Sequence, residues 1–273
     1  MSEPVLVRRE GPVTVLTLND PERANPLSVP VVQALQRELE AAAADPAVRA
    51  VVLTGAGRHF SAGADLAVLE ALAAGGDEAA AREDTGRLWR LFEALLDHPK
   101  LTVAAVHGAA VAGGCGLATA CDLVVAERSA RFGYTEVRIG FVAALVLTFL
   151  VRRVPGHVAR RLLLDPELVD GAEAVRIGLA DRLVEDGEAV REAVRWAAAV
   201  CRKGSPSAIT ATKRLLNRVV GLGWREALAA AAEENVHQRL HPECRRGVRR
   251  FLEARTTPDW LLEDDGGEGD HGR

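Results

Sequence analysis

Apolar and polar positions alternate with a period of two at the start of the chain and change to helical spacing soon after. The alternation over residues 13–18 predicts a strand, and the apolar run at 5–7 predicts another. Ser28 precedes apolar positions at helical spacing, so we expect it to cap a helix over residues 29–44. The apolar run at 49–54 predicts a buried strand.

The rest of the chain separates into a mixed part and a helical part. The elements expected in the mixed part are helices at 64–76 and 80–97, strands at 101–106, 122–126 and 131–133, and a glycine-rich turn into a helix at 108–114. From Phe141 onward the pattern is predominantly helical, most strongly over residues 189–202, 206–220 and 224–238. Strands that alternate with helices, followed by helices alone, predict an α/β core with a helical appendage.

These elements divide the chain into three segments. We expect an α/β core over residues 1–195, a helical region over 196–258 and a tail over 259–273. The tail is acidic and rich in glycine, so we expect it to be disordered. The helical region has more apolar surface than a small core needs, at Ala208, Leu215, Leu216, Val219, Leu228 and Ala232. We therefore expect these helices to pack against other copies of the chain.

Composition limits the classes of function. Of the 273 residues, 48% are hydrophobic and 26% are charged, which is typical of a folded globular protein. The formal net charge of −4 gives no reason to expect a nucleic-acid partner. No apolar segment approaches about 18 residues, and the N-terminus lacks the apolar run of a signal peptide. We therefore expect a cytoplasmic protein with no membrane partner, and free cysteines, because none has metal-type spacing.

Two loops of small residues each join a strand to a helix. They are residues 60–65, FSAGAD, and residues 112–116, AGGCG. Small residues let a ligand approach the backbone, and free N–H groups at a helix start can face a developing negative charge. Two such groups converging on one carbonyl oxygen form an oxyanion hole. Each loop alone is weak evidence for such a site, because glycines also permit a tight turn from strand to helix. The second loop lacks the GxGxxG spacing of a dinucleotide site.

A third motif, FGYTEVRIG at residues 132–140, changes the interpretation. Together the three motifs resemble the crotonase (enoyl-CoA hydratase/isomerase) family. Family members carry a stretch like F-x-A-G-A-D-[LI], here at 60–66, and then a glycine-rich pattern ending in C-D, here at 108–122. The family's N-x-P-x-x-x-N-x-L and F-x-E-K-R are similar to residues 19–27 and 251–255. The resemblance therefore covers almost the whole chain.

The resemblance implies a fold, an assembly and a ligand. The expected fold is α/β, a crotonase-like spiral of ββα units with a C-terminal helical trimerisation region. The expected assembly is a homo-oligomer, either a trimer or a dimer of trimers (a hexamer). The expected ligand is an acyl-CoA thioester substrate. Coenzyme A is part of that substrate, and neither a separate cofactor nor a metal is expected.

The resemblance also implies the residues of the site. The backbone N–H groups of Ala64 and Gly113 would form the oxyanion hole, and Glu136 would be the catalytic carboxylate. Enolisation places charge on the thioester oxygen, and two rigid N–H donors stabilise such a charge. The residues expected to contact the substrate are Arg23, Ala62, Gly63, Asp65, Leu66, Gly116, Tyr134 and Phe141. Arg23 would contact a phosphate of CoA. Tyr134 is also explained as a packed aromatic residue.

Two departures from the family pattern concern the chemistry. Family hydratases use two glutamates, and the position of the first is taken here by Gly116, twenty residues before Glu136 (136 − 116 = 20). Glycine can transfer no proton. The family is also glycine-rich after Gly140, whereas residues 141–150 here, FVAALVLTFL, are bulky and apolar. The wall of the pocket must therefore differ.

The remaining carboxylate, Glu136, has two interpretations. It could be solvated or paired with Arg138, or it could be buried among Phe132, Tyr134 and Phe141, which would raise its pKa as acid–base catalysis requires. Glu70 is the next candidate for a second carboxylate, although a surface glutamate accounts for it as well.

Three functions follow from this set of residues. The first is hydration of 2-enoyl-CoA, because the stretch around Glu136 is similar to that of bacterial enoyl-CoA hydratases. The second is isomerisation of an enoyl-CoA, because one carboxylate suffices to shuttle a proton between C2 and C4. The third is a non-catalytic acyl-CoA-binding protein that lost the first carboxylate. Retention of both loops together with Glu136 argues against the third.

Overall fold

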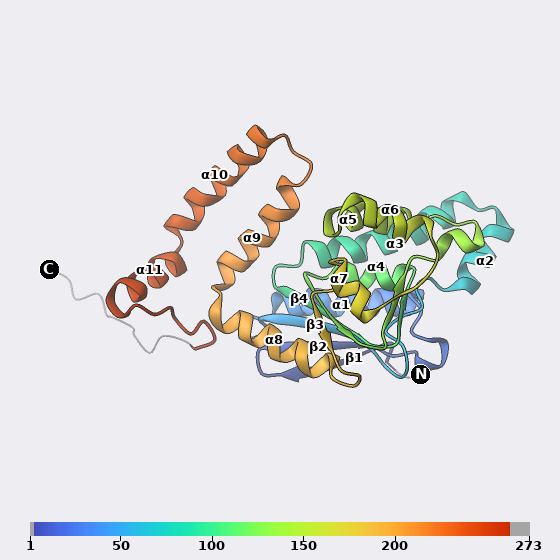
Figure 1. Ribbon diagram of the computed structural model, residues 1–273, viewed down its shortest axis with the longest axis horizontal. Coiled ribbons are helices and arrows are strands. Elements are labelled where there is room, and N and C mark those ends of the chain that lie inside the picture. Colours follow the sequence, from blue (N-terminus) through green and yellow to red (C-terminus); the bar gives the residue numbers. More distant parts are fainter. Residues whose placement is uncertain (1–2, 263–273) are drawn as a thin grey trace. The chain divides into compact units, whose positions relative to one another are not determined.

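The computed structural model describes residues 3–262 and divides into two compact units. The division falls between Ala198 and Ala199, inside helix α8 (Ala189–Lys203). Figure 1 shows the helices and strands in chain order. The first unit carries all the motifs that point to chemistry, and the second is helical.

The main sheet of the first unit has six strands within the described residues. In spatial order they are β1 (Val5–Glu10), β2 (Val13–Leu18), β3 (Ala50–Gly55), β4 (Leu101–Val106), β6 (Leu123–Glu127) and β9 (Arg182–Val184). Strands β1 and β2 pair antiparallel, and every further pair is parallel. All residues of β3 and β4 are buried, which explains their unbroken apolar sequences, because parallel strands are covered on both faces.

A smaller sheet positions the site. It has three strands in the described part of the chain, β5 (Ala109–Val111), β7 (Arg131–Gly133) and β8 (Val169–Asp170). Strands β5 and β7 run parallel, so the segments that follow them leave the sheet at the same edge. These segments carry the second small-residue loop and Glu136.

Helices and two short 3-10 turns cover the sheets of the first unit. They are η1 (Pro21–Arg23), α1 (Val29–Ala44), α2 (Leu66–Gly75), α3 (Glu78–Leu96), α4 (Gly113–Thr119), η2 (Glu136–Ile139), α5 (Ala144–Arg153), α6 (Gly156–Leu164) and α7 (Gly171–Arg176). Leu35 and Leu39 of α1 and Leu91 and Leu95 of α3 are almost fully buried, at the spacing that gives each helix one apolar face. They belong to one continuous core with the strands.

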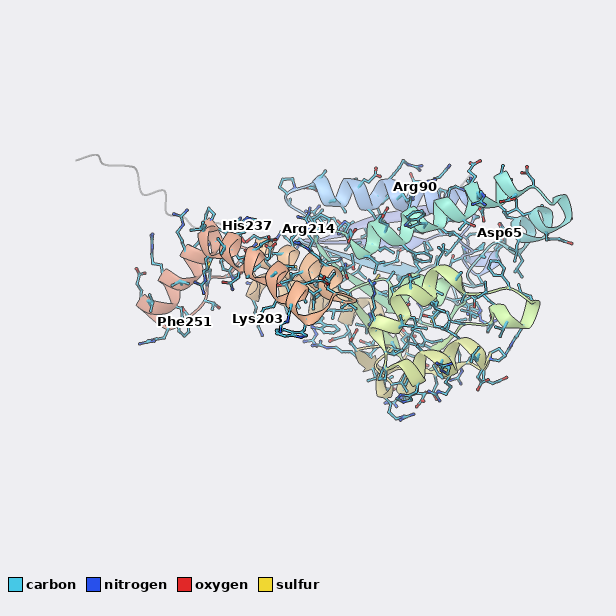
Figure 2. All side chains as sticks on the ribbon, turned by 90° about the horizontal axis from the view of Figure 1, so that it is seen from above. Asp65, Arg90, Lys203, Arg214, His237 and Phe251 are labelled. Atoms are coloured by element: carbon cyan, nitrogen blue, oxygen red, sulfur yellow. The ribbon has the colours of Figure 1, made fainter. Side chains whose placement is uncertain are left out.

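The second unit consists of the end of α8 with α9 (Pro206–Val219), α10 (Trp224–Leu240) and α11 (Pro242–Ala254). His237 on α10 and Phe251 on α11 are labelled in Figure 2. Several large apolar side chains of this unit are exposed, among them Leu216, Trp224, Leu228, Leu240 and Leu252. The expectation that this region mediates oligomerisation remains a prediction.

Most of the expected elements are present, with three corrections. Ser28 occupies the N-cap position of α1, but its side chain makes no capping hydrogen bond. Strands β8 and β9 lie in the stretch expected to be helical, because two or three residues are too few to show a period. The expected tail begins too early: Trp260 is buried, its amide donates to the Arg202 carbonyl, and the Arg246 guanidinium lies over its ring. Residues 263–273 lie outside the described residues.

Within residues 3–262, no helix combines the length and the apolar character needed to cross a membrane.

Candidate active site

The first small-residue loop is hydrogen-bonded alongside β5, with an isolated parallel bridge between Ser61 and Ala110. The Ser61 amide donates to the Ala109 carbonyl, and the Val111 amide donates to the Ser61 carbonyl, both at 3.0 Å. The Phe60 amide donates in the same way to the His107 carbonyl. These bonds hold the loop against the strand that leads into α4, so the two small-residue loops are neighbours.

Buried polar side chains fix the shape of this loop. Asn25 is fully buried, and its Nδ2 donates to the carbonyls of Ala56 and His59. The Ser61 hydroxyl donates to the Asn25 carbonyl and accepts from the Gly63 amide. Losing any of these bonds would leave a buried polar group unsatisfied, which is costly. The backbone before Ala64 is therefore held in one conformation.

The backbones of the two loops approach each other at Gly63 and Gly113. Gly63 has a φ of +88°, and a Cβ there would lie 2.7 Å from the Val111 carbonyl oxygen and 2.9 Å from the Gly113 nitrogen. Only glycine fits this position. A Cβ on Gly113 would lie 3.6 Å from the Ala64 nitrogen. The amide nitrogens of Ala64 and Gly113 therefore lie where the two loops meet.

Within residues 3–262, both of these N–H groups are left out of the regular backbone hydrogen bonds. Gly113 is the first residue of α4, and N–H groups in the first turn of a helix have no helical partner. Ala64 forms a bridge with Leu27, but that bridge uses the Leu27 amide and the Gly63 carbonyl at 2.7 Å. Two adjacent free donors can stabilise a carbonyl oxygen that gains negative charge.

Glu136 is the buried carboxylate of this region. It is the first residue of η2 and is 8% exposed. Its Oε2 is buried and has no hydrogen-bond partner among the described residues. Burial raises the pKa of this carboxyl group above its ordinary value. Arg138 does not pair with it, because the guanidinium donates to the Pro166 carbonyl and to Glu167.

Glu136 lies close to the start of α4. Gly133, three residues before it, pairs with Val111, and its carbonyl accepts from the Ala112 amide at 2.8 Å. The pKa of the Cys115 thiol is raised to about 12, first by burial and further by the negative charge of Glu136. The charge of Glu136 is therefore felt at Cys115 on α4, two residues after Gly113. The structure thus brings the three expected catalytic residues into one region.

Three residues expected to contact substrate are covered in this structure. Gly63 is buried where the two small-residue loops meet, and the other two are Tyr134 and Gly116. Tyr134 is 1% exposed, and its hydroxyl forms a hydrogen bond of 3.0 Å with the Thr119 hydroxyl, so it is a packed aromatic residue behind α4. Gly116 is buried and faces Val146 and Phe92. Neither presents a surface to a ligand here, because other side chains already occupy their surroundings.

The other expected substrate contacts lie nearer the surface. Arg23 forms an ion pair of 2.6 Å with Asp65, which also caps α2 by accepting from the Ala67 amide. Asp65 is labelled at the start of α2 in Figure 2. Three further expected contacts, all exposed, are Ala62, Leu66 and Phe141. Glu70 is also exposed on α2, so it is not a second buried carboxylate.

A match to a family model establishes what this chain is related to. Residues 8–261 match the model described as enoyl-CoA hydratase/isomerase. The chain belongs to this family. The resemblance to the crotonase superfamily seen in the sequence is therefore confirmed.

Individual relatives agree with the family match over nearly the whole chain. A Thermus thermophilus protein named as an enoyl-CoA hydratase is 48% identical over 246 residues, covering 90% of this chain and 96% of that protein. The 2,3-dehydroadipyl-CoA hydratase of Escherichia coli is 34% identical over 95% of this chain and 99% of its own length. The crystal structure of an enoyl-CoA hydratase from Mycobacterium smegmatis superposes with a TM-score of 0.87 at 30% identity, covering 96% of this chain and all of that one. The α/β fold with C-terminal helices is thus the crotonase fold.

Three residues near the site were not singled out from the sequence. Asn25 fixes the first loop, Cys115 is buried on α4, and Val146 covers Gly116. Asn25 falls within the N-terminal motif, which was a usable signal. Val146 gave none, because a valine in an apolar helix has no distinguishing feature until the helix is placed.

Proposed function

We propose that this protein is an enoyl-CoA hydratase, which adds water to a 2-enoyl-CoA to give a 3-hydroxyacyl-CoA. The observation that carries the proposal is the buried Glu136, whose Oε2 has no partner among the described residues and whose pKa is raised by burial. Relatives named as enoyl-CoA hydratases support the same reaction.

The two free amides would stabilise the charge of this reaction. When water adds to C3, electrons of the C2–C3 double bond move toward the thioester. The thioester carbonyl oxygen then carries the negative charge of an enolate. N–H groups of Ala64 and Gly113 would donate to that oxygen. A pre-formed pair of donors gains strength in a buried site, because little water competes for the charge.

One carboxylate is enough for the proton balance. Glu136 takes a proton from the water while the water oxygen bonds to C3, and the enolate forms. Glu136 then returns that proton to C2. The carboxylate ends in its starting state, and the net change is one H on C2 and one OH on C3. A raised pKa suits this exchange, since it makes the carboxylate a better base at working pH.

One observation favours enoyl-CoA isomerisation as a second candidate. Position 116 is a glycine covered by apolar side chains, so no second group is present there to hold a water. Isomerisation of a 3-enoyl-CoA needs only a base that moves a proton from C2 to C4, and Glu136 could do this alone. The same two amides would stabilise the enolate.

Steady-state assays with crotonyl-CoA and with a 3-enoyl-CoA distinguish these functions. A hydratase converts crotonyl-CoA to 3-hydroxybutyryl-CoA with the higher kcat/KM. A higher kcat/KM for conversion of the 3-enoyl-CoA to the 2-enoyl-CoA would select the isomerase instead. Turnover of neither, together with tight binding of both by calorimetry, would contradict an enzymatic function and leave an acyl-CoA-binding protein.

A further inference from the structure

The space beside Gly116 is already filled. A Cβ built on Gly116 would lie 2.1 Å from Cγ1 and 3.2 Å from Cβ of Val146, and 3.5 Å from Cζ of Phe92. The first distance is far inside van der Waals contact, so no side chain fits at position 116 unless Val146 moves.

In the pattern of the family, position 116 carries the first of the two catalytic glutamates. Residues three apart on a helix share a face, so a side chain at 116 would stand one turn beyond the Gly113 amide. A proton-transferring group at 116 would thus have joined the same site as Glu136.

Packing and rotamer preference hold Val146 in this position. It is β-branched and helical, so one χ1 rotamer is strongly preferred, and it is 3% exposed. A different rotamer would still leave the Val146 Cβ 3.2 Å from the added Cβ, which is tighter than an ordinary van der Waals contact. Phe149, one turn later on α5, packs on Phe92 with ring centroids 5.3 Å apart. Only a shift of α5 would open the space.

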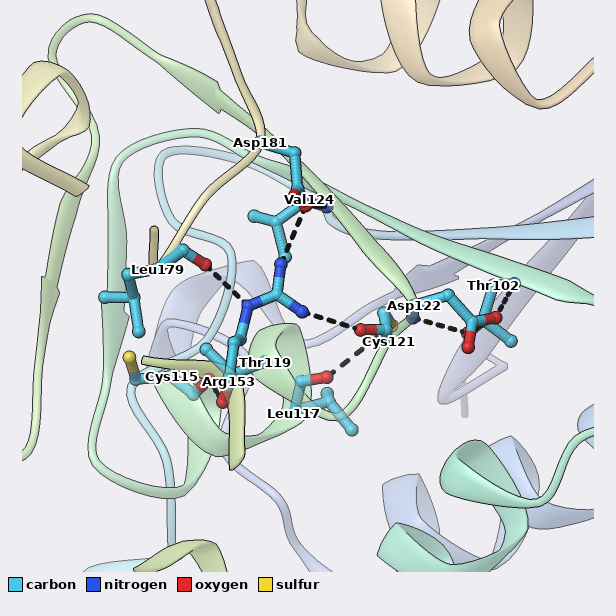
Figure 3. A network of polar contacts seen from close by, with 10 residues as sticks. All are labelled: Thr102, Cys115, Leu117, Thr119, Cys121, Asp122, Val124, Arg153, Leu179 and Asp181. Atoms are coloured by element: carbon cyan, nitrogen blue, oxygen red, sulfur yellow. Dashed lines mark hydrogen bonds and ion pairs between the residues drawn. The ribbon is translucent and has the colours of Figure 1, made fainter. Parts of the chain in front are cut away.

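The C-terminal end of α5 is fixed by Arg153, at the centre of the network in Figure 3. Its guanidinium donates to the carbonyls of Leu179 and Cys121 and forms an ion pair of 2.7 Å with Asp181. Asp181 in turn accepts from the Val124 amide at the start of β6. Since Cys121 lies two residues after the end of α4, this network ties α5 to the segment that leaves α4. A shift of α5 away from Gly116 would break it.

We propose that Val146 is a specificity-determining residue, which fills the space beside Gly116 and thereby restricts the active site to chemistry with one carboxylate. The steric half of this proposal is that Val146 fills the space beside Gly116, and it does not depend on the proposed function. The catalytic half, that this limits the site to one carboxylate, rests on the proposed function. A second carboxylate can then be added only by changing both positions. Glycine at 116 and valine at 146 act as a matched pair.

A stability cycle tests the steric half. Gly116→Ala adds the clashing Cβ and should lower Tm by about 5 °C through overpacking. The same change should cost little when combined with Val146→Gly, which removes the clashing atoms. The control is Val151→Gly, the same substitution at an exposed position of α5. In the Val151→Gly background, Gly116→Ala should lower Tm by as much as it does in the wild type. An equal loss of Tm in both backgrounds would overturn the proposal.

An activity comparison tests the catalytic half. Gly116→Glu/Val146→Gly should hydrate crotonyl-CoA with a kcat at least about tenfold above that of Val146→Gly alone, with no matching gain in isomerisation of a 3-enoyl-CoA. Gly116→Glu/Val151→Gly should show no such gain. A folded double variant whose two activities equal those of Val146→Gly would overturn the proposal and leave Val146 as packing only. A wild-type chain without either activity would instead remove the proposed function and the catalytic half with it, and the stability cycle would still decide the steric half.

Discussion

Glu136→Gln is the change that separates proton transfer from every other role of this side chain. The amide keeps the size of the carboxyl group and nearly all its shape, but cannot exchange a proton at working pH. Because Oε2 has no hydrogen-bond partner among the described residues, the substitution breaks no hydrogen bond at that atom. A loss of activity can therefore be assigned to chemistry.

The expected loss is large and falls on kcat. General acid–base catalysis by a positioned side chain contributes roughly 10² to 10⁴ in rate, so kcat should fall by that factor, or about 3–5 kcal/mol of transition-state stabilisation. KM should change little, because the Ala64 and Gly113 amides come from the backbone and are unaffected. A rise in KM at unchanged kcat would mean that Glu136 binds substrate and does no chemistry.

The same variant carries a stability signature with a defined sign. Burial raises the pKa of Glu136 above its ordinary value of 4.5, so the folded chain holds this proton more tightly than the unfolded chain. Its contribution to the free energy of unfolding is fully present below the unfolded pKa and is lost as pH rises through the raised folded pKa. Glu136→Gln cannot lose a proton there. Its stability relative to the wild type should therefore increase with pH over that window.

The assay pairs steady-state kinetics on crotonyl-CoA with urea unfolding at several pH values. Glu40→Gln is the matched control, since Glu40 is an exposed glutamate of α1 and should retain wild-type values in both measurements. Glu70→Gln should do the same. Wild-type kcat in Glu136→Gln would refute the assignment of the catalytic carboxylate, and a stability difference independent of pH would refute the shifted pKa.

Further outcomes follow from the loops, the network and the helical unit. Gly63→Ala should lower both Tm and kcat, because the added Cβ would lie within 3 Å of the Val111 carbonyl and the Gly113 amide, whereas Gly75→Ala, in open space at the end of α2, should lower neither. Arg153→Met should cost about 3 kcal/mol of unfolding free energy in urea titrations, because Asp181 and two carbonyls lose their donor. Arg23→Ala should raise KM for CoA thioesters at unchanged kcat if the guanidinium leaves Asp65 for a CoA phosphate, and an unchanged KM would contradict this contact. Light scattering should give a multiple of the 29.1 kDa chain mass, and a monomer at all dilutions would contradict the expected oligomer.

The sequence by itself determined the class of fold and the family. Period-two and helical spacing predicted β2 and α1, and unbroken apolar runs predicted β3 and β4, because burial on one face or on both leaves a direct imprint on residue order. Three motifs in the correct order and spacing gave the family. The resemblance carried by the same motifs implied Ala64, Gly113 and Glu136 as the site. Two backbone N–H donors suit a developing oxyanion, and a carboxylate suits proton transfer.

The tertiary structure decided what surrounds those residues. Arg138 donates to Pro166 and Glu167 and not to Glu136, and residues 28 and 29 positions away in the chain leave no mark on the local pattern. Tyr134 was expected to contact substrate, but the hydroxyl of Thr119 holds it behind α4. The sequence showed that Gly116 lacks the carboxylate of the family pattern. The valine that fills the space beside it, Val146, comes from another helix. Contacts between distant segments depend on how the helices pack, and periodicity along one segment carries no information about its neighbour.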